Sequence, residues 1–143
     1  MIDEADWPLM ADYKWCAQGR VGIIYAVARI RGAAHNIVMH RLIMGAAPDQ
    51  LVDHRDCDGL NNRRSNLRFC TRRTNAANAA VRRDNTSGYK GVARNGASGW
   101  QAYIQSDRGH QYLGSYATAR KAAEAYDAAA REYFGEFARV NLR

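Results

Sequence analysis

Short apolar segments separated by polar turns fill the first part of the chain. Alternating apolar and polar residues at 25–30 and 35–40 predict two strands of a β-hairpin, with a glycine-containing turn between them. The apolar segment 40–44 predicts a short helix. Residues 1–20, with two tryptophans among acidic residues, predict a cap or turn that leads into a helix and packs on this sheet.

A second pattern follows directly. Residues 51–54 and 66–70 predict two strands joined by a loop rich in Asn, Asp and Gly. Thr71 or Thr74 is a suitable N-cap for a helix that ends at about Arg83. The order is therefore strand, loop, strand, helix.

The composition changes after a short linker at 84–88, and the last part of the chain predicts a small sheet and one helix. Thr118 is a suitable cap for that helix, which Gly135 ends. The pattern therefore predicts two small α+β domains, residues 1–84 and 85–143. The three strands of the second domain are expected at 89–94, 100–106 and 111–116.

The charge of the chain indicates a polyanionic partner. The formal net charge is +7 and the isoelectric point is about 9.7. Of 21 basic residues only 3 are lysines, so 18 are arginines, which bind phosphate groups and guanine edges well. No apolar run is long enough to span a membrane, and the N-terminus is acidic where a secretion signal would be basic. We expect an intracellular nucleic-acid-binding protein with no membrane partner.

Asp53 and His54 are the strongest candidates for chemistry. Neighbours on a regular strand face opposite sides, so both can reach one site only if the strand ends there, as the turn-forming residues 56–59 indicate. A carboxylate can hold a divalent cation while a neutral imidazole accepts a proton from water. Together these groups can hydrolyse a phosphodiester, with Mg²⁺ or Mn²⁺ as the cofactor.

The three cysteines leave one alternative open. Cys57 and Cys70, with His54 and His40, could surround zinc, although their spacing matches no standard zinc pattern. Without a secretion signal, the odd number of cysteines favours free thiols.

The second motif resembles a known family. The pair Asp53-His54, the triplet at 66–68 and Asn75 are similar to the motif of HNH endonucleases, in the variant found in phage and intron homing endonucleases. Asn66 follows His54 by 12 residues and Asn75 follows it by 21, and 40–44 resembles the segment before the motif. The resemblance implies a ββα-metal fold.

The resemblance also implies roles for these residues. Asp53 and Asn75 would bind the metal, and His54 would be the general base. Asn66 would pin the loop and orient the histidine. Arginines surround the motif and are expected to bind phosphates, although the position of Arg68 between Leu67 and Phe69 suggests a structural role. The expected phosphate contacts are Arg63, Arg64, Arg72 and Arg73.

The second domain resembles the AP2 DNA-binding domain. Segments 87–92, 100–104, 112–116, 123–129 and 135–138 carry the similarity. It implies a three-stranded antiparallel sheet, packed on one helix, that lies in the major groove. This chain departs from the plant AP2 pattern, which has arginine or tryptophan at several of these positions. The expected DNA-facing residues are Lys90, Arg94, Tyr103, Gln105, His110 and Tyr112.

These patterns predict a metal-dependent endonuclease that acts on double-stranded DNA and leaves a 5′-phosphate and a 3′-hydroxyl. We expect it to bind as a monomer and to use no small-molecule cofactor. The competing hypothesis is a non-catalytic, sequence-specific regulator with a degenerate nuclease core. A third, an RNA-binding module, rests on charge alone.

Overall fold

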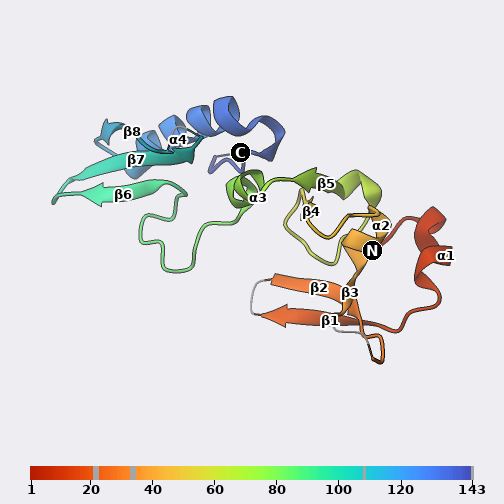
Figure 1. The fold of residues 1–143 in the computed structure, drawn as a ribbon. Helices are drawn as coiled ribbons and strands as arrows, with labels where there is room; N and C mark the ends of the chain where they lie inside the picture. The colour runs from red at the N-terminus through yellow and green to blue at the C-terminus, as the bar shows by residue number, and fades with distance from the viewer. Residues whose placement is uncertain (21–22, 33–34, 108, 143) are drawn as a thin grey trace. The chain divides into compact units, whose positions relative to one another are not determined.

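The structure is a computed structural model, which describes residues 1–20, 23–32, 35–107 and 109–142 (Figure 1). The chain forms two compact units, Met1–Arg72 and Arg73–Arg143. In the described ranges, no helix has the length and apolar character needed to cross a membrane.

The first unit opens with elements that the sequence pattern did not predict correctly. A strand at Trp15–Arg20 lies where a turn and helix were expected, and the helical residues before it are confined to one short 3₁₀ turn and a four-residue α-helix at Trp7–Met10. Residue pairs such as Cys16 and Val27 join this strand to the next one, so tertiary pairing determines a conformation that local alternation does not. The elements are η1 (Glu4–Asp6), α1 (Trp7–Met10), β1 (Trp15–Arg20), β2 (Ile23–Ala28), β3 (Ile37–Val38) and α2 (Met39–Ile43).

The sheet β1-β2-β3 is antiparallel throughout. The predicted pairing of the segments at 25–30 and 35–40 is present between β2 and β3, although it joins only two residue pairs. The short helix predicted at 40–44 is confirmed as α2. Met39 and Ile43 of α2 pack with Met10 and Leu67 in the core of this unit.

The predicted strand, loop and strand are confirmed. β4 (Leu51–His54) and β5 (Leu67–Cys70) form an antiparallel pair, and η2 (Arg64–Asn66) leads into β5. In this register Asp53 lies opposite Arg68 and His54 lies opposite Leu67. The pair therefore places the two candidate catalytic residues at the end of one strand.

The second unit holds a helix, a sheet and a second helix. α3 (Arg72–Asn78) begins at the last residue of the first unit and is shorter than the helix expected to reach Arg83. β6 (Val92–Asn95), β7 (Gly99–Ser106) and β8 (Gly109–Tyr116) form an antiparallel sheet, with α4 (Ala119–Phe134) and η3 (Gly135–Phe137) after it. The predicted three-stranded sheet with one helix is confirmed.

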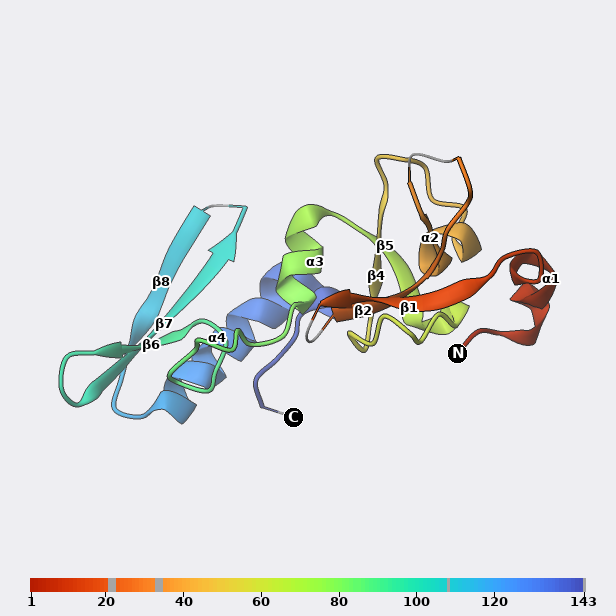
Figure 2. The ribbon, with the colours of Figure 1, turned by 90° about the horizontal axis from the view of Figure 1, so that it is seen from below.

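α4 lies along one face of this sheet, as Figures 1 and 2 show. Its alanines allow close packing, since Ala122 and Ala123 are fully buried against Ala102 of β7. The predicted cap is present, because the Thr118 side chain accepts a hydrogen bond from the Lys121 amide at 3.2 Å. Burial of this small-residue stripe leaves the opposite face of the sheet uncovered by α4.

Candidate functional site

Asp53 and His54 end β4 and are both buried, with 7% and 5% of their surfaces exposed. The strand ends at His54, as the sequence predicted, and the chain turns at residues 55–57. Buried charged and titratable groups need partners, since removing them from water is costly. The neighbours of these two side chains therefore determine what the site can do.

Arg68 is the partner of Asp53. Its Nε and Nη2 atoms both donate to Asp53 Oδ2, at 3.0 and 2.8 Å, across the β4–β5 pair. Both residues are only 7% exposed, so the guanidinium compensates the carboxylate in a dry setting.

The loop between β4 and β5 is held by side chains that cross it. Asp56 Oδ1 accepts from Asn66 Nδ2 at 2.9 Å, and Asp56 Oδ2 accepts from Asn61 Nδ2 at 2.7 Å. Burial would raise the pKa of Asp56, but hydrogen bonds from Asn61, the Asp58 amide and Asn66 hold it below its usual value. The Asn66 side chain, which also donates to the Asn61 carbonyl at 2.8 Å, therefore joins distant parts of the loop.

A second asparagine of this loop, Asn62, makes a hydrogen bond with the His54 ring. Asn62 Oδ1 lies 3.1 Å from His54 Nε2, and Asn62 is fully buried. The Asn66 amide bonds to Asp56 and to the Asn61 carbonyl. The contact of Asn62 with His54 could not be predicted from the sequence, because an asparagine in a turn-rich loop ordinarily indicates a turn.

A second histidine packs against His54. The ring of His40 meets that of His54 edge to face, with centroids 4.8 Å apart, and Tyr25 lies 5.3 Å from His40. Among the described residues, His40 Nδ1 has no hydrogen-bond partner. Burial, then His54 and Arg41, lower the pKa of His40 to about 4. His40 is therefore uncharged at neutral pH, and its ring packs directly beside that of His54.

The four arginines expected to bind phosphate differ in their surroundings. Arg64 makes a bidentate contact with the buried Asp6. Because this contact joins η1 to the loop, the Arg64 guanidinium has a structural role. Arg73 forms an ion pair with Asp107. Arg63 and Arg72 are exposed. The expectation of phosphate contacts thus fits Arg63 and Arg72 best.

Asn75 and Asn78 both lie in α3, in the second unit. Asn75 is exposed and Asn78 is buried. The role of Asn75 as a metal ligand stays a prediction. Within the part of the chain that the structure describes, no three His, Cys, Asp or Glu residues are grouped to hold a metal ion, and this includes the cysteines and histidines of the zinc alternative.

Comparison with known proteins decides the family. A family model described as HNH endonuclease matches residues 33–77. The chain is also 31% identical over 138 residues to an uncharacterized HNH endonuclease of Acanthamoeba polyphaga mimivirus, covering 94% of this chain and 70% of the relative. The chain belongs to the HNH endonuclease family. No solved structure matches it.

Membership of the HNH endonuclease family implies a nuclease that acts on DNA, and the matched segment contains the site described above. Asp53, His54 and Asn66 all lie within it, together with Asn62 and Arg68. The matched segment ends at residue 77, so the sheet β6-β7-β8 lies outside it.

That sheet presents an aromatic and polar face opposite α4. Tyr103 pairs with Tyr112 across β7 and β8, and Gln105 pairs with His110. Tyr103 stacks on His110 with ring centroids 4.8 Å apart. Residues that alternate with them, such as Ile104, are buried against α4. Four of the six expected DNA-facing residues therefore share the face that α4 does not cover.

The other two expected residues, Arg94 and Lys90, do not lie on this face, and DNA contacts by them stay a prediction. Arg94 shares the α4 side with Val92, two residues before it, and its guanidinium lies 4.7 Å from the Trp100 ring centroid. Lys90 precedes β6, and its ammonium donates to the carbonyls of Ala76, Ala77 and Ala79 at 2.9, 2.6 and 3.0 Å. These bonds stabilise the C-terminal end of α3, where a cation is favourable.

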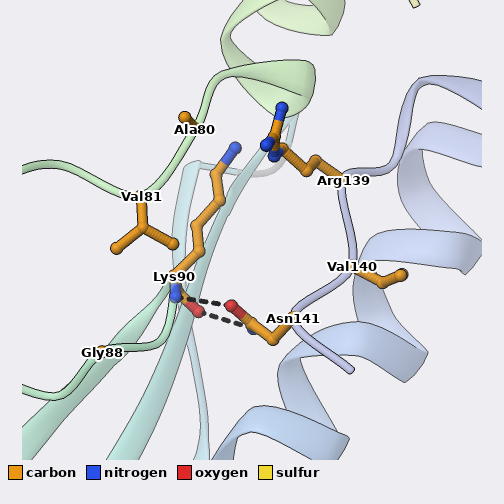
Figure 3. A pocket seen from close by; sticks show the side chains of 7 residues that line it. All are labelled: Ala80, Val81, Gly88, Lys90, Arg139, Val140 and Asn141. Carbon is orange, nitrogen blue, oxygen red and sulfur yellow. Dashed lines mark hydrogen bonds between the residues drawn. The ribbon is translucent and has the colours of Figure 1, made fainter. Parts of the chain in front are cut away.

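Figure 3 shows the surroundings of Lys90 in the second unit. The Lys90 amide donates to Asn141 Oδ1 at 2.7 Å, and Asn141 Nδ2 donates to the Lys90 carbonyl at 3.1 Å. Asn141 is in turn fixed by the buried Asp127 of α4, whose Oδ1 accepts from the Asn141 amide at 2.7 Å. The pocket that Lys90 and Asn141 line is therefore a structural junction, at which the C-terminal segment is joined to α4. It is lined by Ala80, Val81, Gly88, Lys90, Arg139, Val140 and Asn141.

Proposed function

We propose that this chain is a metal-dependent endonuclease that hydrolyses phosphodiester bonds of double-stranded DNA. The observation that carries the proposal is that the adjacent residues Asp53 and His54 end β4 and are each held by a buried side chain. These partners are Arg68 and Asn62, and the chain belongs to the HNH endonuclease family. A regulator that only bound DNA would have no need for this arrangement, because binding requires neither a proton acceptor nor a metal ligand.

The reaction uses few protein groups. His54 takes the proton from water as the water oxygen forms a bond to phosphorus, and the bond from phosphorus to the 3′-oxygen breaks. Asp53 and Asn75 are oxygen donors of the kind that Mg²⁺ or Mn²⁺ prefers, and would hold the cation. A bound cation would stabilise charge on the phosphate and the leaving oxygen. Exposed Arg63 and Arg72 would hold the flanking phosphates.

A plasmid assay tests the proposal and its metal dependence. With Mg²⁺ or Mn²⁺, the protein is expected to convert supercoiled plasmid to relaxed or linear forms, and EDTA is expected to stop this conversion completely. Religation of the linear or nicked product by a ligase would confirm the expected 5′-phosphate and 3′-hydroxyl ends. Retardation of the plasmid on a gel without breakage, in either metal, would support the non-catalytic DNA-binding alternative.

The sheet β6-β7-β8 adds a second proposal, that its uncovered face binds DNA in the manner of AP2 domains. Support comes from the shared position of Tyr103, Gln105, His110 and Tyr112. A β-surface fits the width of the major groove, and amide and imidazole groups can bond to base edges there. Since this face carries little positive charge, its contribution to affinity is expected to come from contacts with the bases more than from neutralised phosphates.

Replacing Tyr112 with alanine tests this face. Tyr112 is 58% exposed, so its loss has little effect on folding but removes a contact surface. We expect duplex affinity to fall roughly 5- to 100-fold, equivalent to about 1–3 kcal/mol, in a fluorescence anisotropy titration. Trp7→Ala is the matched control, because Trp7 is also exposed, at 64%, but lies in α1. Equal affinities for both variants would contradict DNA binding by this face.

A further inference from the structure

We propose that Asn62 is a positioning residue of the nuclease site, which holds the proton of the neutral His54 ring on Nε2 and so assigns proton acceptance to Nδ1. The inference rests on the proposed function for its catalytic meaning. Its structural basis is the contact of 3.1 Å between Asn62 Oδ1 and His54 Nε2.

The first step concerns the orientation of the Asn62 amide. Its Nδ2 points at the Gly59 carbonyl at 3.5 Å, while its Oδ1 points at the His54 ring. Rotating the amide by half a turn would set its oxygen against the Gly59 carbonyl oxygen, so that two acceptors would face each other. The oxygen therefore lies on the His54 side.

The second step concerns the proton. An amide oxygen can only accept a hydrogen bond, so the His54 Nε2 atom facing it must be the donor. A neutral imidazole carries one ring proton, and fixing it on Nε2 leaves the basic lone pair on Nδ1. The contact to Asn62 thus selects one of the two ring nitrogens as the base.

The third step concerns rigidity, since a positioning residue must itself be held. Asn62 is fully buried, and its backbone amide donates to the Met1 carbonyl at 2.8 Å. The N-terminal ammonium of Met1 donates in turn to the Leu60 carbonyl at 2.6 Å. Gly59 lies so close to β2 that an added Cβ would be 2.3 Å from the Ile24 carbonyl oxygen. The loop therefore has little room to move the Asn62 amide.

Nuclear magnetic resonance of the whole chain tests the assignment without reference to cleavage. In ¹⁵N-labelled wild-type protein at a pH where His54 is neutral, we expect a slowly exchanging ring proton on His54 that correlates with Nε2. A proton found on Nδ1 would overturn the proposal, whatever the enzyme does to DNA. This measurement needs no variant.

Two variants then test the effect on catalysis. Asn62→Leu keeps the shape but removes the acceptor, and is expected to lose the protected Nε2 proton and to lower the single-turnover cleavage rate about 10- to 100-fold. Asn62→Asp keeps an acceptor oxygen and is expected to retain both the proton and a rate above that of Asn62→Leu. Duplex affinity is expected to stay within about 3-fold of wild type in both, since outer partners act through the group they orient.

Asn36→Leu is the matched control, because Asn36 is an exposed asparagine of the first unit that bonds to Gln18. It is expected to cleave like wild type. If Asn62→Leu folds, loses the Nε2 proton and still cleaves at the wild-type rate, the positioning role is wrong. If wild type shows the Nε2 proton but never cleaves DNA, the proposed function fails and the contact is structural only.

Discussion

Replacing Arg68 with alanine is expected to lower the free energy of unfolding by about 3–5 kcal/mol. The ion pair between Arg68 and Asp53 is buried, since each of the two side chains is only 7% exposed. Its guanidinium makes two hydrogen bonds to Asp53 Oδ2, at 3.0 and 2.8 Å. The variant would leave the Asp53 carboxylate buried without its compensating charge, and breaking one side of a buried pair is far more costly than removing an exposed one.

Urea unfolding followed by circular dichroism measures this effect. Arg63→Ala is the matched control, since Arg63 belongs to the same segment but is exposed, and is expected to change the free energy of unfolding by less than about 0.5 kcal/mol. The double variant Asp53→Ala/Arg68→Ala is expected to recover part of the loss, because it removes the uncompensated carboxylate as well. A loss below about 1 kcal/mol for Arg68→Ala would mean that the pair is not the stabilising contact that its geometry indicates.

Local patterns were sufficient to predict the elements that form the nuclease site and the second sheet. The apolar residues Leu51 and Val52, the turn residues after His54 and the alternation at 67–70 describe β4 and β5 without reference to the rest of the chain. α4 was also predictable, since a threonine cap, a stripe of alanines and Gly135 all agree. Where each level of the sequence favours the same element, the structure contains it.

Contacts distant in sequence account for the remaining differences. β1 has no clear alternation and is a strand because Trp15–Arg20 pairs along its whole length with β2. α3 ends early at Asn78, and Lys90, 11 to 14 residues away from the carbonyls that it caps, bonds to its end. Neither contact follows from the composition of the segment that it determines, so a window of local sequence cannot reveal it.

The site shows the same division between local and distant information. The sequence singled out Asp53 and His54 as candidates, because a carboxylate beside an imidazole is recognisable by residue type alone. It did not identify the buried partners of these residues. Asn62 and Arg68 approach them only after the loop closes and β4 pairs with β5. The candidate carboxylate and imidazole are thus recognisable from residue type, whereas the groups that contact them depend on the fold.

Replacing His54 with alanine is expected to lower the single-turnover rate of DNA cleavage by about 10²–10⁴-fold. Removing the imidazole removes the group that accepts the proton of the attacking water, while Asp53 and the exposed arginines stay in place. Duplex affinity should therefore stay close to that of wild type. His35→Ala is the matched control, because His35 is a histidine of the same unit that is exposed, and it should cleave at the wild-type rate.

Rates are best compared at saturating protein with one labelled duplex, so that binding and chemistry are separated. Cooperative unfolding of His54→Ala must first show that the buried position tolerates the change. If the folded variant still cleaves at more than about a tenth of the wild-type rate, His54 is not the general base. His40 would then be the next candidate, because its ring lies 4.8 Å from that of His54 and burial with neighbouring charges lowers its pKa to about 4, which keeps it neutral at pH 7. Loss of cleavage in His54→Ala together with its retention in His40→Ala would assign the proton transfer to His54 alone.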